Sequence, residues 1–204
     1  MNYKIIPAFA EPLCVTKLDE EFCKPLKKLK GMQQNIPEND ENRINFNILD
    51  KVPKVKNKLI KVFSDYINQH ILNTPDQKWT ITASWITENS NGYQMNRHNH
   101  RNSYYSSVFY FDEVADEHPP LILENPLHKT GLFVEAQVPN VYSGDDFAAP
   151  ITEGTILFFP SHIFHFHPSF VFNKVPRKSL ACNYIPIGKY GRYDSSLDTR
   201  KLHG

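Results

Sequence analysis

The sequence predicts a mainly β fold, a barrel or sandwich that helices buttress on one face. Apolar residues recur at helical spacing before Pro75, and short runs of β-branched and aromatic residues separated by proline, glycine and asparagine follow it. With 204 residues and 40% hydrophobic content, the chain can bury one sizeable core. We therefore expect a single domain, in which residues 1–75 form a helical buttress, 76–190 the β core and 191–204 a C-terminal tail.

Two helices are expected in the buttress. The first spans residues 16–30, with Thr16 as its candidate cap, and Pro25 should shorten or bend it. Residues 32–47 are rich in Asn, Glu, Asp and Gln, a composition typical of a surface loop. The second helix begins near Pro53 and carries its apolar residues on one side of a helical wheel, with lysine and asparagine opposite. Such a helix packs one face against an apolar surface.

Seven short segments are candidate strands. They are residues 79–87, 93–97, 106–111, 121–124, 132–138, 155–159 and 179–185. Seven or eight short strands after two helices are typical of a barrel or sandwich with helices on one face. Two segments rich in Asp, Gly, Pro and aromatic residues, 113–128 and 139–150, are placed to form a lid over the barrel mouth.

Charge and composition argue against several kinds of partner. The 23 Lys and Arg residues nearly cancel the 22 Asp and Glu residues, so no global field favours nucleic acid or an anionic membrane. No run approaches the ~20 apolar residues of a membrane span, and no signal peptide is visible. Cys14, Cys23 and Cys182 have neither metal-site spacing nor a disulfide pattern, which suits a reducing compartment. We expect a soluble cytoplasmic protein that acts on a small molecule or peptide.

A pair of histidines, His98 and His100, is the first candidate for metal binding. Residues two apart in an extended segment project to one side, so both imidazoles can reach the same point. Imidazole suits Fe, Zn, Cu and Ni, and the pair alone names no metal. Two solvated histidines in a polar loop are the alternative, and the pair by itself favours neither.

A second histidine cluster supports the metal site. His162, His165 and His167 follow the apolar run 156–159, so a buried strand would deliver them to the barrel mouth. His165 and His167 would share a strand face, whereas His162 would not. The pattern does not rank His165 over His167, and a histidine bonded to the backbone in an aromatic belt is the alternative for each.

Arg177 and Ser179 point to a carboxylate site. They share a face of a predicted strand, so a guanidinium and a hydroxyl project together into the interior. A guanidinium binds a carboxylate through two parallel hydrogen bonds, and the hydroxyl adds a third. A solvated basic patch with Lys174 and Lys178 is the alternative for Arg177. The histidine twelve residues upstream favours the carboxylate site.

Taken together, these motifs resemble the 2-oxoglutarate and Fe(II)-dependent oxygenases of bacteria and phages, which include prolyl-hydroxylase-like proteins. The resemblance rests on His98-x-His100, the runs 103–111 and 154–161, His165 and Arg177-x-Ser179. It spans residues 79–188 and extends to residues 5–9 and the helices that follow. It implies a double-stranded β-helix, a cupin-like jelly-roll of two sheets with iron at the open end.

The resemblance also implies roles for the matched residues. His98 and His165 take two of the positions that bind the metal. Arg177 and Ser179 bind the far carboxylate of 2-oxoglutarate. The implied reaction uses Fe(II), 2-oxoglutarate and O2 to hydroxylate a free or peptidyl amino acid or a small metabolite, and it releases succinate and CO2.

Two further residues, Tyr110 and Asn89, are candidates for contacts with the cosubstrate. Both can equally be ordinary strand residues.

The chain departs from the family pattern at one position. The family usually has Asp or Glu two residues after the first histidine, and this chain has His100. We expect His100 to be the third metal ligand, which leaves the site more positive by one charge. The alternatives are a His100 that lies beside the metal without binding it, and a carboxylate from elsewhere, such as Asp112.

Two rival functions fit parts of the same pattern. Gly92 before His98, and Gly154 and Pro160 before His165, also fit a cupin-type metal-binding protein, although the glutamate of that template is absent. A cupin would bind metal and ignore 2-oxoglutarate. A non-catalytic jelly-roll accessory protein with a degenerate metal site would bind neither.

Overall fold

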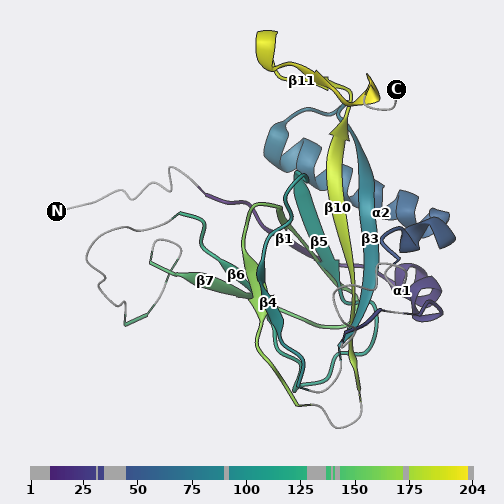
Figure 1. The fold of residues 1–204 in the computed structure, drawn as a ribbon, viewed down its shortest axis with the longest axis vertical. Helices are drawn as coiled ribbons and strands as arrows, with labels where there is room; N and C mark the ends of the chain where they lie inside the picture. The colour runs from purple at the N-terminus through teal and green to yellow at the C-terminus, as the bar shows by residue number, and fades with distance from the viewer. Residues whose placement is uncertain are drawn as a thin grey trace.

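The larger of two main sheets holds six strands. A computed structural model describes residues 10–30, 32–34, 45–89, 92–127, 137–138, 140, 143–171 and 175–201. The strand order in the six-stranded sheet is β1 (Cys14–Lys17), β8 (Thr155–Pro160), β5 (Tyr105–Phe109), β10 (Arg177–Ile187), β3 (Lys78–Asn89) and β2 (Met32–Gln34). Neighbours are antiparallel, apart from the parallel pair β2 and β3. The long strands β3 and β10 lie side by side (Figure 1).

The smaller sheet has four antiparallel strands and packs against the larger one. Its order is β4 (Met95–His98), β9 (His165–His167), β6 (Leu121–Glu124) and β7 (Asp146–Ala149). An apolar cluster joins the sheets: Leu121 and Leu123 from β6 meet Leu157 and Phe159 from β8. Two facing antiparallel sheets form the jelly-roll, so the predicted fold class is confirmed.

Helices cover the other face of the larger sheet (Figure 1). They are α1 (Glu20–Lys27) and α2 (Pro53–Tyr66), which runs on into a π-helical turn, Ile67–Leu72. Short 3-10 turns occupy Ile48–Lys51, Tyr193–Ser195 and Thr199–Lys201. No helix in the described ranges is long and apolar enough to cross a membrane.

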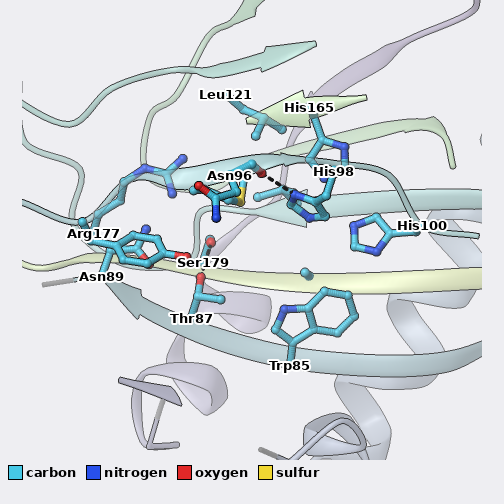
Figure 2. A pocket seen from close by; sticks show the side chains of 14 residues that line it. Trp85, Thr87, Asn89, Asn96, His98, His100, Leu121, His165, Arg177 and Ser179 are labelled. Atoms are coloured by element: carbon cyan, nitrogen blue, oxygen red, sulfur yellow. Dashed lines mark hydrogen bonds between the residues drawn. The ribbon is translucent and has the colours of Figure 1, made fainter. Parts of the chain in front are cut away.

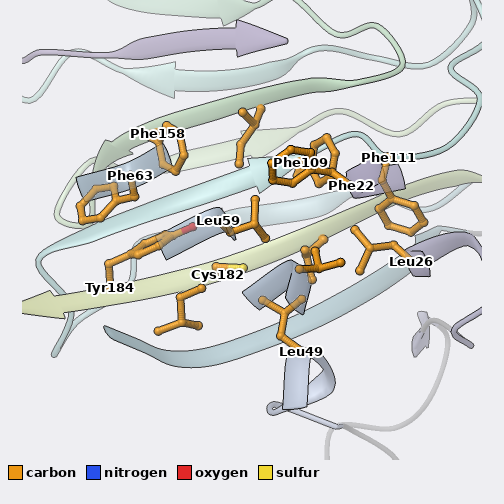
Figure 3. Packing of buried hydrophobic residues seen from close by; sticks show 14 of the residues in the cluster. Phe22, Leu26, Leu49, Leu59, Phe63, Phe109, Phe111, Phe158, Cys182 and Tyr184 are labelled. Carbon is orange, nitrogen blue, oxygen red and sulfur yellow. The ribbon is translucent and has the colours of Figure 1, made fainter. Parts of the chain in front are cut away.

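Phe63 of α2 is at the centre of the packing between helix and sheet. It is fully buried, and its ring stacks on Tyr184 at 4.2 Å between centroids. It also meets Trp79 edge-on at 5.1 Å and Phe158 at 5.5 Å. Figure 3 shows this cluster between the helices and strands β5, β8 and β10. Burying these rings explains how the amphipathic helix and the sheet hold each other in place.

Strand β10 is covered on both faces, one of which packs in the core while the other lines a cavity. Leu180, Cys182 and Tyr184 point into the helix-side core. Arg177, Ser179 and Ala181 alternate with them and line a cavity between the sheets. The packing of the helices therefore fixes the position of the cavity wall.

The first helix is shorter than predicted. Residues Cys14–Lys17 pair with β8, so Thr16 lies in a strand and is not the helix cap. The cap is Asp19, whose carboxylate accepts a hydrogen bond from the Glu21 amide at 2.9 Å. Pro25 lies in the last turn, and α1 ends at Lys27, as the expected shortening by proline requires.

Several strands differ from the prediction. Residues 32–34 and 146–149 form β2 and β7 within segments expected to be loops. The segment 191–204 was expected to be a tail, but Leu197 and Asp198 within it form β12 (Leu197–Asp198), which pairs in a hairpin with β11 (Lys189–Tyr190). The described residues leave out the opening 5–9 and most of the predicted strand at 132–138. They also leave out residue 128 of the first expected lid segment and residues 139, 141 and 142 of the second.

Candidate metal centre

Three histidines converge between the two sheets. His98 ends β4 and His165 begins β9, and the two are directly opposite in the ladder. His100 follows two residues later, where its backbone N–H donates to the Ser161 carbonyl at 3.0 Å. One ring nitrogen from each histidine lies within 4.8 Å of the others. The structure thus brings together the three histidines that the sequence suggested as metal ligands.

Backbone carbonyls orient two of the rings. Nδ1 of His98 lies 2.8 Å from the Asn96 carbonyl, and Nδ1 of His165 lies 3.1 Å from the Ile163 carbonyl. A carbonyl only accepts, so each Nδ1 carries the hydrogen and each Nε2 presents a lone pair. A bonded second nitrogen is the usual arrangement for a histidine that binds metal.

Burial keeps the imidazoles neutral. It lowers the pKa of His100 to about 4, with nearby His98 adding to the effect. Burial also lowers the pKa of His165 to about 3, and His98 lowers it further. Neutral imidazole is the form that binds a metal, so both residues are ready to do so at neutral pH.

The histidines form one wall of a cavity of about 250 Å³ (Figure 2). Three directly paired positions of β10 and β3 form the facing wall. They are Arg177 with Asn89, Ser179 with Thr87, and Ala181 with Trp85. The other lining residues are Tyr93, Met95, Asn96, His98, His100, Val108, Leu121 and His165. Figure 2 shows Arg177 and Asn89 at one end, and His100 and Trp85 at the other.

Arg177 and Ser179 stand where a carboxylate could be held. Arg177 is 3% exposed, and its Nη2 donates to the Tyr110 hydroxyl at 2.9 Å. Its Nε has no hydrogen-bond partner among the described residues. The Ser179 hydroxyl lies 2.9 Å from the Thr87 hydroxyl. A buried, unpaired guanidinium N–H is costly, so this end of the cavity suits an anionic group with free acceptors.

The two weaker candidates for cosubstrate contacts lie at different depths. Asn89 lines the cavity, and its Oδ1 has no partner within the described part of the chain. Tyr110 is fully buried, contacts Arg177 and is not a lining residue. The Tyr110 hydroxyl therefore orients the guanidinium rather than facing the cavity.

The remaining histidines of the second cluster lie outside the metal centre. His167 is buried, and its Nε2 lies 3.0 Å from the Asn89 amide nitrogen. His162 is exposed and contacts Glu11 at 3.1 Å. Pairing across the sheet places His165 opposite His98 and His167 opposite Met95. His165 and His167 share the buried face of β9, as alternation predicts, but only His165 lies opposite another histidine.

A carboxylate ligand is missing from the described residues around the centre. Asp112, considered as a substitute, contacts Lys27 at 3.6 Å and Lys178 at 3.5 Å, and it does not line the cavity. The donor set is therefore three imidazoles, which fit an Fe(II) ion. The unpaired Arg177 Nε fits an acidic cosubstrate.

Sequence reasoning missed Thr87 and the contact between His167 and Asn89. Thr87 lies between Trp85 and Asn89 on the cavity face of β3, so alternation along that strand would have indicated it. The His167 contact depends on how β9 is placed relative to β3, for which the sequence holds no signal.

Comparisons with known proteins agree with this geometry. A family model described as "Putative 2OG-Fe(II) oxygenase" matches residues 83–183, which include all three histidines, Arg177 and Ser179. No curated protein matches the sequence.

Solved structures of other proteins are similar to this chain at low sequence identity. AviO1 from Streptomyces viridochromogenes Tue57 has a TM-score of 0.56 and 16% identity over 85% of this chain and 89% of its own. HygX from Streptomyces hygroscopicus, with nickel and 2-oxoglutarate bound, has a TM-score of 0.54 and 10% identity over 85% and 81%. An oxidoreductase of the 2OG-Fe(II) oxygenase family from Burkholderia pseudomallei has a TM-score of 0.48 and 11% identity. That match covers 66% of this chain and 55% of the other protein.

Proposed function

Because the chain belongs to the 2-oxoglutarate and Fe(II)-dependent oxygenases, we propose that it hydroxylates a free or peptidyl amino acid or another small metabolite. In the overall reaction, a substrate C–H bond, O2 and 2-oxoglutarate become an alcohol, succinate and CO2. One observation carries this assignment: three imidazoles and a buried, incompletely bonded arginine face the same cavity. A cupin that binds metal alone has no use for such an arginine.

We assign the metal to His98, His100 and His165. The ring nitrogens of these residues lie within 4.8 Å of one another, and burial holds His100 and His165 in the neutral form. When bound there, Fe(II) supplies the redox chemistry that activates O2. The chain's own contribution is to orient the His98 and His165 rings through backbone carbonyls and to shield the cavity between two sheets.

We assign the far carboxylate of 2-oxoglutarate to Arg177 and Ser179. The Arg177 guanidinium has a free N–H, and Tyr110 holds its other end. Ser179 and Thr87 add hydroxyls at the next paired position of the same wall. Asn89 would lie beside this carboxylate as a secondary contact.

The rest of the chain is assigned to support and location. We propose that residues 1–75, 76–190 and 191–204 work as one domain, because one apolar cluster joins helices and sheet and Thr199 is hydrogen-bonded to Gly188. A cytoplasmic location is supported by three free cysteines, two of them buried. The motifs are similar to those of oxygenases from bacteria and phages, which supports a bacterial or phage origin for this protein.

Anaerobic titration with Fe(II) and 2-oxoglutarate tests the assignment. The chelate should give a visible charge-transfer band, and Arg177→Ala should weaken 2-oxoglutarate binding on the order of 100-fold, because a charged double hydrogen bond is lost. Arg97→Ala is the matched control. Arg97 is paired with Glu124 outside the cavity, so its loss should leave 2-oxoglutarate affinity unchanged.

Three outcomes separate the candidate functions. A band that Arg177→Ala weakens supports the oxygenase. Metal binding without any response to 2-oxoglutarate identifies a cupin-type protein. A chain that binds neither is a non-catalytic jelly-roll.

A further inference from the structure

The described residues that line the cavity supply one fixed positive charge and no negative one. The positive charge is Arg177, whose hydrogen-bond partner, Tyr110, is a neutral hydroxyl. The remaining lining side chains are amides, hydroxyls, imidazoles, a thioether, aromatic rings and aliphatic groups. An arginine buried to this extent needs an anion as its counter-charge.

Two carboxylates close to the cavity walls are already paired elsewhere. Asp112 contacts Lys27 and Lys178, and both oxygens of Glu124 accept from Arg97. None of these side chains lines the cavity. The described chain therefore offers no internal anion to balance a metal ion.

The charge of the loaded site follows from the proposed function. Fe(II) brings two positive charges and Arg177 one, against the two negative charges of 2-oxoglutarate. One positive charge stays unbalanced, because His100 is neutral where a family member usually has a carboxylate. An unbalanced charge between two sheets is expensive in a medium of low dielectric.

We propose that the centre binds one further monoanion beside the metal, at the end of the cavity lined by His100 and Trp85. This inference rests on the proposed function. The end of the cavity with Arg177 and Asn89 is assigned to the cosubstrate, so the opposite end is left for the monoanion (Figure 2). A carboxylate of the substrate or a free anion from solution has the required charge. The first source would make the substrate a carboxylic acid.

Azide titration of the protein loaded anaerobically with Fe(II) and 2-oxoglutarate provides the test. One equivalent of azide should bind to the wild type and shift the charge-transfer band. The variants His100→Asp and His100→Asn are a matched pair, since their side chains have the same shape and differ by one charge. Azide should bind at least tenfold more weakly to His100→Asp than to His100→Asn.

A control removes a positive charge outside the cavity. Lys178→Gln lowers the net charge by one on the opposite face of β10, beside Asp112. Its azide affinity should equal that of the wild type. Equal losses in Lys178→Gln and His100→Asp would mean that net charge governs binding and would overturn the proposal.

Pairs of acids and amides distinguish the two sources of the anion. Free amino acids and short peptides are offered with their C-terminal amides as competitors of azide. If the substrate supplies the carboxylate, an acid displaces azide at least tenfold better than its amide. If acids and amides displace it equally, the anion comes from solution.

Different results overturn the monoanion site and the proposed function. A charge-transfer band that azide does not shift overturns the inference alone. The absence of the band overturns both. If neither His100 variant retains iron, the azide stoichiometry of the wild type decides: one equivalent supports the proposal and none overturns it.

Discussion

His167 supports the proposed cosubstrate site through a hydrogen-bond chain. Its Nδ1 lies 2.9 Å from the Pro168 carbonyl, so Nδ1 carries the hydrogen and Nε2 accepts from the Asn89 amide at 3.0 Å. Asn89 is thereby held opposite Arg177 in the ladder between β3 and β10. His167 is a positioning residue that acts through Asn89.

Replacing His167 should separate cosubstrate binding from metal binding. We expect His167→Phe to weaken 2-oxoglutarate binding by about tenfold, the effect of roughly one lost hydrogen bond, with Fe(II) affinity unchanged. His162→Phe is the control, since His162 is exposed and contacts Glu11. Calorimetry of both ligands measures the two affinities. A loss of Fe(II) affinity in the absence of 2-oxoglutarate would make His167 a metal ligand.

Among single residues, motif spacing predicted the site better than alternation did. His98, His100, His165, Arg177 and Ser179 all line one cavity, as the sequence suggested. Alternation could not separate His165 from its neighbour two residues on, because that choice depends on the register between β9 and β4. The paired residues of β4 and β9 lie more than 60 positions apart in the sequence, so the local pattern does not reveal that register.

At the level of elements, the junction between helix α1 and strand β8 depends on Gly154. Its φ is +85°, and a Cβ atom there would lie 2.7 Å from the Leu18 carbonyl oxygen. The Gly154 carbonyl accepts from the Leu18 N–H at 2.8 Å, and the Gly154 N–H donates to the backbone carbonyl of Tyr110 at 2.8 Å. The backbone approaches too closely here for any side chain.

Gly154→Ala should therefore destabilise the protein by about 2–4 kcal/mol, combining backbone strain with a clash. Gly92→Ala is the matched control, because Gly92 has a φ of +79° and open space around its Cβ position. It should cost only about 1 kcal/mol. Urea unfolding measures both. Equal losses would show that strain alone, without the clash, sets the cost.

Elements with long periodic patterns were predicted well, whereas the short edge strands β1, β2 and β7 were not. The helix from Pro53 and the strands β3, β8 and β10 carry strong apolar patterns that extend over many residues. Strands β1 and β7 have four residues each, and most of their side chains are exposed or half-exposed. Such strands gain their conformation from the ladder with a neighbour, so their own residues carry little signal.

For the molecule as a whole, buried histidines link stability to pH. The pKa of His165 is lowered to about 3, and those of His100 and His167 to about 4, in each case chiefly by burial. An unfolded chain takes up protons on these residues below about pH 6.5, whereas the folded chain does not. Stability from these groups is therefore present above pH 6.5 and lost as the pH falls toward 4.

The metal-free protein should lose on the order of 1–2 kcal/mol per buried histidine between pH 6.5 and pH 5. Urea midpoints at the two pH values measure the loss. His167→Phe should reduce this pH dependence by about a third, while His162→Phe should leave it intact. A midpoint that stays constant over this range would contradict the burial of neutral histidines.

Strand β10 limits which changes of sequence this protein can tolerate. Its even-numbered residues from Leu180 to Tyr184 serve the helix-side core, and its odd-numbered residues from Arg177 to Ala181 serve the cavity. Substitution affects one side at a time. Deletion of a single residue within the strand would exchange the two sides, placing polar groups among the helices and apolar groups in the cavity. Related chains should therefore vary in composition along β10 but keep its length between Arg177 and Tyr184.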